Sequence, residues 1–470
     1  MPSFTETLRL TPCAGLLFKL NFFREREMSE RQLSLNLFIY PNGHHEAAWR
    51  HPQSVPESSM DIGYYQQLAL RAEREKLDAI FFANSPSLAE SGHEGLRIRF
   101  EPITWLAAIA AVTQRIGLIA TASTTYSEPY NLARSFSALD HLSKGRAGWN
   151  IVTTSMAAAA ANFGLDKHPS ASDRYAQAEE FVQVVGDLWD SWEDDALVLD
   201  KTSGVFANGD KVHAINHVGT HYKVKGPFNS PRSPQGRPVQ VQAGSSEDGR
   251  DFASRHAEAI FTAHQTLQSA TEFANDIRAR AKAVGRDPGQ LKILPGISPY
   301  IGSTEAEAQR KFDELNELVL PHISLGQLRR MLGADLTGHE LDAPFPRHLI
   351  NFDSSESQSS RFKLIIDIVD REKPTLRQLI NRLAGARGHW VPVGTPVQIA
   401  DLIEQWFRSG AADGFNVMPP AFPEGFEGFL DEVLPILRKR GLFRSEYSGS
   451  TLREHYGLNR PASRFSLKSA

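Results

Sequence analysis

The chain has 470 residues, of which 41% are hydrophobic and 23% are charged, a composition that excludes a disordered or fibrous protein. The formal net charge of -4 gives no reason to expect nucleic acid or an anionic membrane surface as a partner. The single cysteine, Cys13, excludes a disulfide framework and a cysteine metal cluster and favours a reducing compartment such as the cytoplasm. No apolar run approaches the roughly 18 residues that span a bilayer.

The first 32 residues differ from the rest of the chain. Residues 8–23 are mildly apolar, but Arg9 and Lys19 interrupt them and a charged run follows, so they make a poor signal peptide. We expect residues 1–32 to be a disordered extension or an over-long start, with Met28 as a natural beginning before the first strand.

Short apolar runs alternate with segments of helical periodicity along the chain. We predict strands at residues 33–40, 79–83, 115–122, 147–153, 238–242, 259–263, 292–301 and 414–418. We predict the main helices at residues 61–76, 102–113, 129–142, 173–192, 247–256, 267–284, 304–319, 396–409 and 426–440. Continuous apolar strands separated by helices are typical of a parallel sheet that is buried on both faces.

Two insertions interrupt this alternation. Residues 194–236 are rich in Gly, Pro, Asn and His and contain a possible small hairpin at 212–224. Residues 320–390 show no strand alternation and contain several prolines and a Ser-rich stretch at 354–360. We therefore treat both stretches as additions to a regular α/β fold.

The pattern predicts a single (β/α)8 TIM barrel over residues 33–456, with a C-terminal tail at 457–470. The competing architecture is a doubly wound open sheet. No GxGxxG follows the first strand, which disfavours the dinucleotide-binding form of that sheet.

The carboxyl ends of the strands carry the function of such a barrel. They are rich in amides and hydroxyls and poor in carboxylates, and include Asn84, Thr121, Ser123, Asn150 and Thr154. This set suits hydrogen bonding to a large polar cofactor better than hydrolysis by paired acids or metal catalysis. For Asn150 and its neighbour in the run, packing as satisfied core residues is an equally good interpretation.

A His-rich loop follows the first strand. His44, His45 and Trp49 are candidates for lining a pocket, together with Ser155 after the fourth strand. No HExxH motif or carboxylate partner completes the histidines, so we expect no metal site.

The run Gly244-Ser245-Ser246 is a candidate phosphate site. Glycine allows close backbone approach, the hydroxyls donate, and the following helix presents free N–H groups. The alternative interpretation is a plain N-cap, because Ser before Glu247-Asp248 also begins a helix well.

Several motifs together resemble one enzyme family. They are SKGRAGWNIVTT at 143–154, STTYSEPYNLAR at 123–134, RYAQAEEFVQVVGDLWDSWEDDA at 174–196, GPFNSPRSPQGRPVQVQAGSSEDGRDFASRHAEAIF at 226–261 and LPILRKRGLFR at 434–444. Over residues 33–456 the chain resembles flavin-dependent monooxygenases of the bacterial-luciferase-like superfamily. The most similar branch contains nitrilotriacetate monooxygenase component A, dibenzothiophene-sulfone monooxygenases and long-chain alkane monooxygenases.

The resemblance implies a two-component monooxygenase. FMN would arrive in its reduced form, FMNH2, from a separate NAD(P)H:flavin reductase, and O2 would convert it to a C4a-hydroperoxide. One oxygen atom would then enter a small organic substrate of the organosulfur, aminopolycarboxylate or alkane type. A homodimer or homotetramer is also implied. Histidines and arginines of the second insertion could meet an anionic substrate or face solvent: His322, Arg329, Arg330, Arg347 and His348.

The resemblance also implies roles for residues that match its motifs. Thr121 and Ser123 would lie near the isoalloxazine with Asn150 and Thr154 close by. Tyr175 would bind the phosphate region with Gly244 and Ser245 or Ser246.

Two positions depart from the family pattern. Asn84 stands where the family usually has Asp, and Ala171 where it often has His. These departures motivate one alternative, a non-catalytic flavin-binding relative. A second alternative is a deazaflavin-dependent oxidoreductase that transfers hydride, which the run at 226–261 disfavours.

Overall fold

The computed structural model describes residues 31–88, 99–352 and 360–466 and contains a closed barrel of parallel strands. The strands follow one another around the barrel in the order β1-β14-β11-β10-β9-β4-β3-β2. Their bounds are β1 (Ser34–Ile39), β2 (Ala79–Phe82), β3 (Gly117–Ser123), β4 (Ala147–Val152), β9 (Val239–Ala243), β10 (Ala259–Thr262), β11 (Lys292–Ile297) and β14 (Gly414–Val417). The predicted TIM barrel is confirmed.

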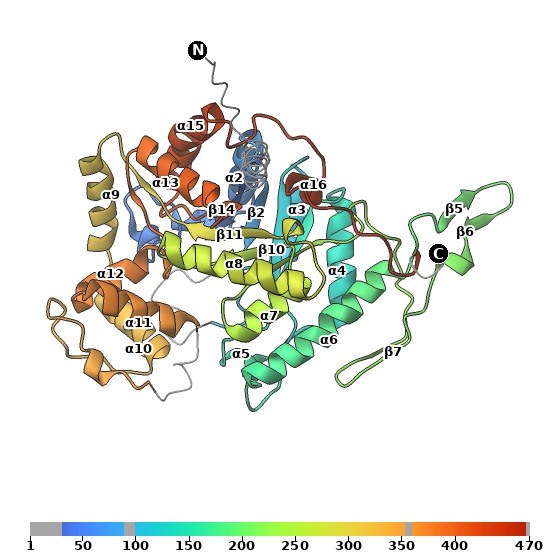
Figure 1. Cartoon of the computed structure of the whole chain (residues 1–470), viewed down its shortest axis with the longest axis horizontal. Helices are drawn as coiled ribbons and strands as arrows, with labels where there is room; N and C mark the ends of the chain where they lie inside the picture. The colour runs from blue at the N-terminus through green and yellow to red at the C-terminus, as the bar shows by residue number, and fades with distance from the viewer. Residues whose placement is uncertain (1–30, 89–98, 353–359, 467–470) are drawn as a thin grey trace, which may run out of the picture.

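Helices surround this barrel (Figure 1). They are α2 (Ile62–Arg74), α3 (Pro102–Ala110), α4 (Pro129–Leu142), α6 (Ala171–Asp190), α7 (Glu247–His256), α8 (Leu267–Ala283), α9 (Glu305–Glu317), α13 (Pro396–Arg408), α14 (Glu424–Gly428) and α15 (Leu434–Lys439), with a short α5 (Ala159–Asn162) after β4. No helix in the described ranges is long and apolar enough to cross a membrane.

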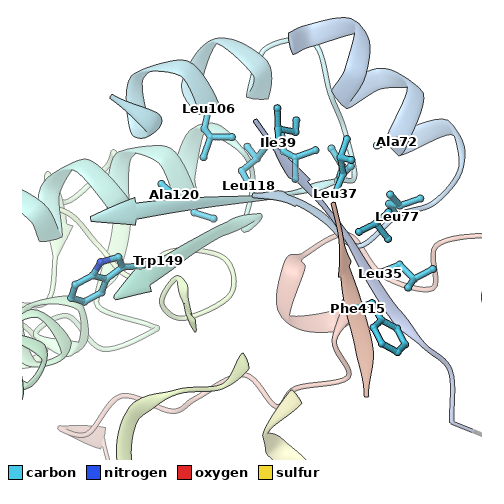
Figure 2. Packing of buried hydrophobic residues seen from close by; sticks show 14 of the residues in the cluster. Leu35, Leu37, Ile39, Ala72, Leu77, Leu106, Leu118, Ala120, Trp149 and Phe415 are labelled. Atoms are coloured by element: carbon cyan, nitrogen blue, oxygen red, sulfur yellow. The ribbon is translucent and has the colours of Figure 1, made fainter. Parts of the chain in front are cut away.

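The strands are buried on both faces, as their unbroken apolar sequences predict. Leu35, Leu37 and Leu118 belong to the layer between strands and helices (Figure 2). Phe38 and Phe81 belong to the cluster that fills the barrel, and their rings stack at 4.5 Å between centroids. The interior is therefore a packed core rather than a channel.

The first insertion forms two hairpins. β5 (Leu197–Asp200) pairs with β6 (Val205–Ala207), and β7 (His217–Val218) pairs with β8 (Lys223–Val224). Both project from the body near α6 (Figure 1). The hairpin predicted within residues 212–224 is β7–β8, whereas β5–β6 was not predicted.

The second insertion is helical. It contains α10 (Pro321–Leu332), α11 (Ser360–Glu372) and α12 (Leu376–Ala386), which share a hydrophobic cluster of their own. Figure 1 shows these helices grouped at one side of the barrel. The Ser-rich stretch at 354–360 lies outside the described residues except for Ser360.

One predicted strand needs correction. The seventh strand was expected to run over 292–301, but β11 ends at Ile297, and β12 (Tyr300–Ile301) leaves the barrel to pair with β13 (Val393–Gly394). Pro299 between them has no N–H to continue the ladder. The closing helix predicted at 426–440 is confirmed as a continuous helical segment from Glu424 to Lys439, in which a π-helical turn, η8 (Phe429–Val433), joins α14 to α15.

The amino end of the barrel is closed by the C-terminal segment. A short helix, α16 (Leu452–His455), packs so closely that a Cβ on Gly117 would lie 2.5 Å from Leu452 Cδ1. The Tyr456 hydroxyl donates to Asn36 Oδ1 at 2.8 Å inside the barrel. Within the described ranges, the end left for ligands is therefore the opposite one, where the strands finish.

Of the predicted N-terminal extension, only Arg31 and Gln32 are among the described residues. The Arg31 guanidinium pairs with Asp413 at 2.7 Å and lies 4.8 Å from the centre of the Phe407 ring. Residue 31 therefore already contacts the barrel.

Candidate cofactor site

An amide and a hydroxyl meet on the inner side of β3 and β4. Asn150 Nδ2 donates to Thr121 Oγ1 at 2.9 Å, and that hydroxyl donates to the carbonyl of Phe82 at 2.8 Å. Asn150 is buried, and its Oδ1 has no hydrogen-bond partner among the described residues. An enclosed amide oxygen without a donor is costly, so it is a fitting acceptor for the ring N–H of a bound flavin.

Trp149 next to it faces the other way because side chains alternate along a strand. Its indole donates to the carbonyl of Ala122 at 3.2 Å and packs against Phe181 and Trp189 of α6. Trp149 is therefore a core residue, and Asn150 is the residue of the pair that faces the barrel.

Two hydroxyls link the ends of the same strands. Thr154 Oγ1 donates to Ser123 Oγ at 2.8 Å, and the Ser123 oxygen also accepts from the backbone N–H of Thr125 and of Tyr126. These contacts occupy the Ser123 lone pairs and leave its proton free for a ligand. Thr154 has a φ of 45°, a left-handed conformation that non-glycine residues adopt rarely and often at functional sites.

The candidate phosphate site lies where β9 meets α7. Ser246 caps the helix by accepting from the N–H of Gly249 at 3.2 Å. The Tyr175 hydroxyl, from α6, lies against the same turn: a Cβ on Gly249 would be 3.0 Å from both Tyr175 Oη and Ser246 Oγ. Tyr175, Gly244 and Ser246 are thus brought together across more than 60 residues of sequence, at the positive end of a helix.

A buried amide lies under this turn. Gln242 Oε1 has no hydrogen-bond partner among the described residues, and a Cβ on Gly244 would lie 2.7 Å from Gln242 Nε2. Ser245 is partly exposed beside it. The two interpretations of this run, a helix N-cap and a phosphate site, are therefore compatible. Ser246 is the N-cap of α7, while the glycines of the turn and the Gln242 amide remain able to contact a ligand.

A hydrogen-bonded chain that the sequence did not reveal lies beside Thr154. Arg174 Nη1 donates to His168 Nε2 at 2.9 Å, and His168 Nδ1 lies 2.7 Å from the Tyr126 hydroxyl. Since Nε2 accepts, the imidazole proton sits on Nδ1 and is donated to Tyr126, whose own proton is left free. Burial, followed by the Arg174 charge, lowers the pKa of His168, which favours this neutral tautomer.

The hydrogen bonds of His168 matter for position 171, where this protein has Ala and the family often has His. Ala171 is the exposed first residue of α6, whereas His168 lies three residues earlier and reaches the site. The only sequence signal was a histidine just before Pro169 and the N-cap Ser170.

The two loop histidines are fully enclosed. His44 Nε2 donates to the carbonyl of Phe38 at 2.8 Å, and burial holds the pKa of His44 well below its usual range. His45 Nε2 is 3.2 Å from Asn316 Oδ1 of α9, and burial lowers the pKa of His45 to about 4. Both rings are neutral at pH 7, and His45 ties the loop to α9.

The other candidates lie apart from this centre. Trp49 lines a cavity with Leu320 and Arg387, Ser155 is exposed, and Asn84 is half-buried after β2 with no hydrogen bond to another described residue. The charged residues named for the second insertion are all exposed: His322, Arg329, Arg330, Arg347 and His348. Within the described ranges, no three His, Cys, Asp or Glu side chains gather as a metal site requires.

Fold and site together define an α/β barrel whose open end presents hydroxyl and amide groups and a helix N-terminus, a set of groups suited to a large cofactor that carries a phosphate. The model of the family described as luciferase-like monooxygenase matches residues 42–413. The chain belongs to this family, and it is a flavin-dependent monooxygenase.

Two curated relatives support this assignment. N-acetyl-S-(2-succino)cysteine monooxygenase of Bacillus subtilis strain 168 is 49% identical over 437 residues, covering 93% of this chain and 99% of the relative. Nitrilotriacetate monooxygenase component A of Aminobacter aminovorans is 46% identical over 447 residues, covering 92% and 98%. The crystal structure of riboflavin lyase with modified FMN and riboflavin has a TM-score of 0.80 and 34% identity, covering 92% of this chain and 97% of the other.

Proposed function

We propose that the protein is the oxygenating component of a two-component system that uses FMNH2 from a separate NAD(P)H:flavin reductase and O2. The observation that carries the proposal is the convergence of Tyr175, Ser246 and the α7 N-terminus at one end of the barrel, beside the Thr121–Asn150 pair. The relative named component A and the neighbour that holds modified FMN support the same cofactor and the need for a second component.

Each group of residues has a distinct task in this proposal. Asn150 Oδ1 and the Ser123 hydroxyl orient the flavin ring, while Tyr175, Ser245 and Ser246 hold its phosphate at the helix end. When bound, reduced FMN supplies the activation of O2. The Phe-lined barrel interior excludes water, and the free proton of Tyr126 is positioned to be donated where negative charge develops.

The two alternatives are less favoured. Both curated relatives are named monooxygenases, which speaks against hydride transfer from a deazaflavin. A non-catalytic relative was motivated by Asn84 and Ala171, yet His168, three residues before Ala171, supplies an imidazole that hydrogen-bonds to Tyr126 and Arg174.

Anaerobic titration with reduced FMN and, separately, reduced riboflavin tests the proposal. The two flavins differ only by the phosphate, so FMN should bind at least tenfold more tightly if the α7 turn holds that group. Mixing the complex with oxygenated buffer and a flavin reductase should then give substrate-dependent oxygen incorporation. Failure to bind reduced FMN at micromolar concentration would overturn the proposal.

We also propose a homodimer or homotetramer in the cytoplasm. The β5–β6 hairpin exposes Leu199 at 57% and Phe206 at 66%, an apolar surface on a projecting arm (Figure 1) that is typical of subunit contacts. A Phe206→Glu variant should sediment as a smaller species than the wild type; an unchanged mass would place the contact elsewhere.

A further inference from the structure

Three arginines from separate segments gather around Tyr40, the residue that follows β1. The guanidinium of Arg99, just before α3, lies 4.1 Å from the centre of the Tyr40 ring. The guanidinium of Arg387, at the end of α12, lies 4.3 Å from the same centre. Arg361 of α11 points to this region as well: a Cβ on Gly388 would lie 2.8 Å from its Nη1. We call Arg99, Arg361 and Arg387 the arginine cluster.

The arginine cluster has no counter-charge among the described residues. None of its members makes an ion pair with a described carboxylate, and Arg361 Nη1 is buried without a hydrogen-bond partner there. Burial, with a smaller effect from the Arg387 charge, lowers the pKa of Arg361 to about 10. Burying a cation without a partner is unfavourable, so this arrangement favours the binding of an anion.

Three other buried arginines have carboxylate partners. Arg232 pairs with Asp190 at 2.7 Å, Arg444 with Asp78 at 2.7 Å, and Arg453 with Glu258 at 2.5 Å. Buried Arg146 is held by backbone carbonyl groups instead, whereas Arg361 Nη1 has neither kind of partner among the described residues.

The arginine cluster lies at the end of the barrel where the strands finish. The segment after Arg387 is fixed there, because Gln265 Nε2, after β10, donates to the carbonyl of Gly388 at 2.6 Å. Trp390 N–H donates to the carbonyl of Gly296 of β11 at 3.3 Å. The His389 ring stacks on Phe261, which belongs to the barrel interior, at 4.8 Å. The cluster therefore borders the same opening as Ser123 and Thr154.

We propose that the arginine cluster binds a substrate carrying at least two carboxylates and so selects a polycarboxylate as the molecule to be oxygenated. Guanidinium groups pair with carboxylates in a bidentate, planar manner, and three of them exceed what one carboxylate can satisfy. A neutral alkane or sulfone would leave the cations desolvated and unpaired, which disfavours its binding. The inference rests on the proposed monooxygenase function, since it names the substrate class of that site.

Isothermal titration of the protein, with and without anaerobic reduced FMN, tests this inference. The probes are propane-1,2,3-tricarboxylate, its neutral trimethyl ester, butyrate and inorganic phosphate. Arg361→Gln and Arg387→Gln remove one guanidinium each. Arg382→Gln is the matched control, because Arg382 lies on the same helix as Arg387 but is bound to Gln265 at 3.0 Å and lies 3.6 Å from Glu372.

The tricarboxylate should bind at least tenfold more tightly than butyrate, the ester or phosphate. Each cluster variant should lose at least tenfold, and Arg382→Gln should stay within about twofold of the wild type. Equal binding of tricarboxylate and ester, binding of phosphate as tight as tricarboxylate, or equal losses in all three variants would overturn the inference.

Reduced-FMN affinity separates the two proposals. If FMN binds normally while the tricarboxylate does not, the substrate inference fails and the monooxygenase proposal stands. If the tricarboxylate binds but reduced FMN does not, the arginine cluster is an anion site, but the monooxygenase proposal fails and with it the assignment of that anion as the oxygenated substrate. A variant that loses both ligands has a damaged fold, and Arg99→Gln then replaces it under the same criterion.

Discussion

The hydroxyl groups of Ser123 and Thr154 lie 2.8 Å apart and join the ends of β3 and β4. Thr154 makes this contact in a left-handed conformation, with φ at 45°. A residue held in that conformation by a side-chain hydrogen bond presents both hydroxyls at the rim of the barrel, where the proposed flavin ring would lie.

Thr154→Val keeps the side-chain shape and removes the hydroxyl that binds Ser123. Loss of one neutral hydrogen bond should weaken reduced-FMN binding by about 3- to 10-fold. The adjacent Thr153→Val is the control, because the Thr153 hydroxyl makes no hydrogen bond to another described residue. Anaerobic absorbance titration measures both; equal affinities for the two variants would contradict a role for the Ser123–Thr154 contact.

Ser246→Ala separates capping from phosphate binding. Ser246 caps α7 and Thr304 caps α9 with the same 3.2 Å contact to a backbone N–H. Each alanine variant should lose about 1 kcal/mol of the free energy of unfolding. Only Ser246→Ala should also lose the preference for reduced FMN over reduced riboflavin. If Thr304→Ala loses that preference equally, the effect comes from stability alone.

Tyr126→Phe tests the Arg174–His168–Tyr126 chain. In the wild type the Tyr126 ring stacks on Phe163 with 4.5 Å between the ring centroids, and the phenylalanine ring should keep this contact. FMN affinity should therefore change by less than about threefold. Product formed per reduced flavin should fall by about tenfold or more, with matching release of hydrogen peroxide, because a proton donor is lost. Tyr130→Phe is the control, since the Tyr130 hydroxyl makes no hydrogen bond within the described residues. Unchanged coupling in Tyr126→Phe would rule out this donor.

His455 makes stability depend on pH. Its Nε2 donates to the carbonyl of Arg115 at 2.7 Å, and burial lowers the pKa of His455 to about 4. In the unfolded chain His455 takes up a proton near the ordinary histidine pKa, whereas in the folded protein it stays neutral down to about pH 4. The contribution of neutral His455 to the free energy of unfolding is therefore complete above the ordinary histidine pKa and is lost as the pH falls toward 4. At pH 5 the loss is about 2 kcal/mol.

His455→Gln keeps a donor for Arg115 and cannot be protonated. Chemical unfolding at pH 7.5 and pH 5 should therefore show a drop in unfolding free energy that is about 2 kcal/mol smaller in the variant. His339→Gln, at an exposed position, is the control. Identical drops in wild type and His455→Gln would mean that the folded protein protonates His455 freely.

The barrel strands were predictable because burial on both faces leaves an unbroken apolar run in the sequence. The run at Ala147 to Val152 is one example. The sequence did not show which of its side chains face the barrel interior, and the structure places Trp149 against α6 and Asn150 inside the barrel. The pairing of Tyr175 with Gly244 depends on tertiary contacts, and only the family resemblance suggested it.

The arginine cluster and the role of His168 could not be predicted from the neighbouring residues in the sequence. Arg99, Arg361 and Arg387 are separated by long stretches of chain, and nothing in their neighbours marks them as different from the exposed Arg329 or Arg347. Charge becomes informative only when the structure shows which cations lack a carboxylate. His168 was missed for a similar reason, because its partners lie on different elements.

The seal formed by Leu452 and Tyr456 has a consequence for synthesis. These residues contact Gly117 and Asn36, which leave the ribosome hundreds of residues earlier. The amino end of the barrel therefore stays open, with apolar strand ends exposed, until Leu452 and Tyr456 have been synthesised and have left the ribosome. A premature stop before Leu452 would therefore yield an unsealed barrel prone to aggregation.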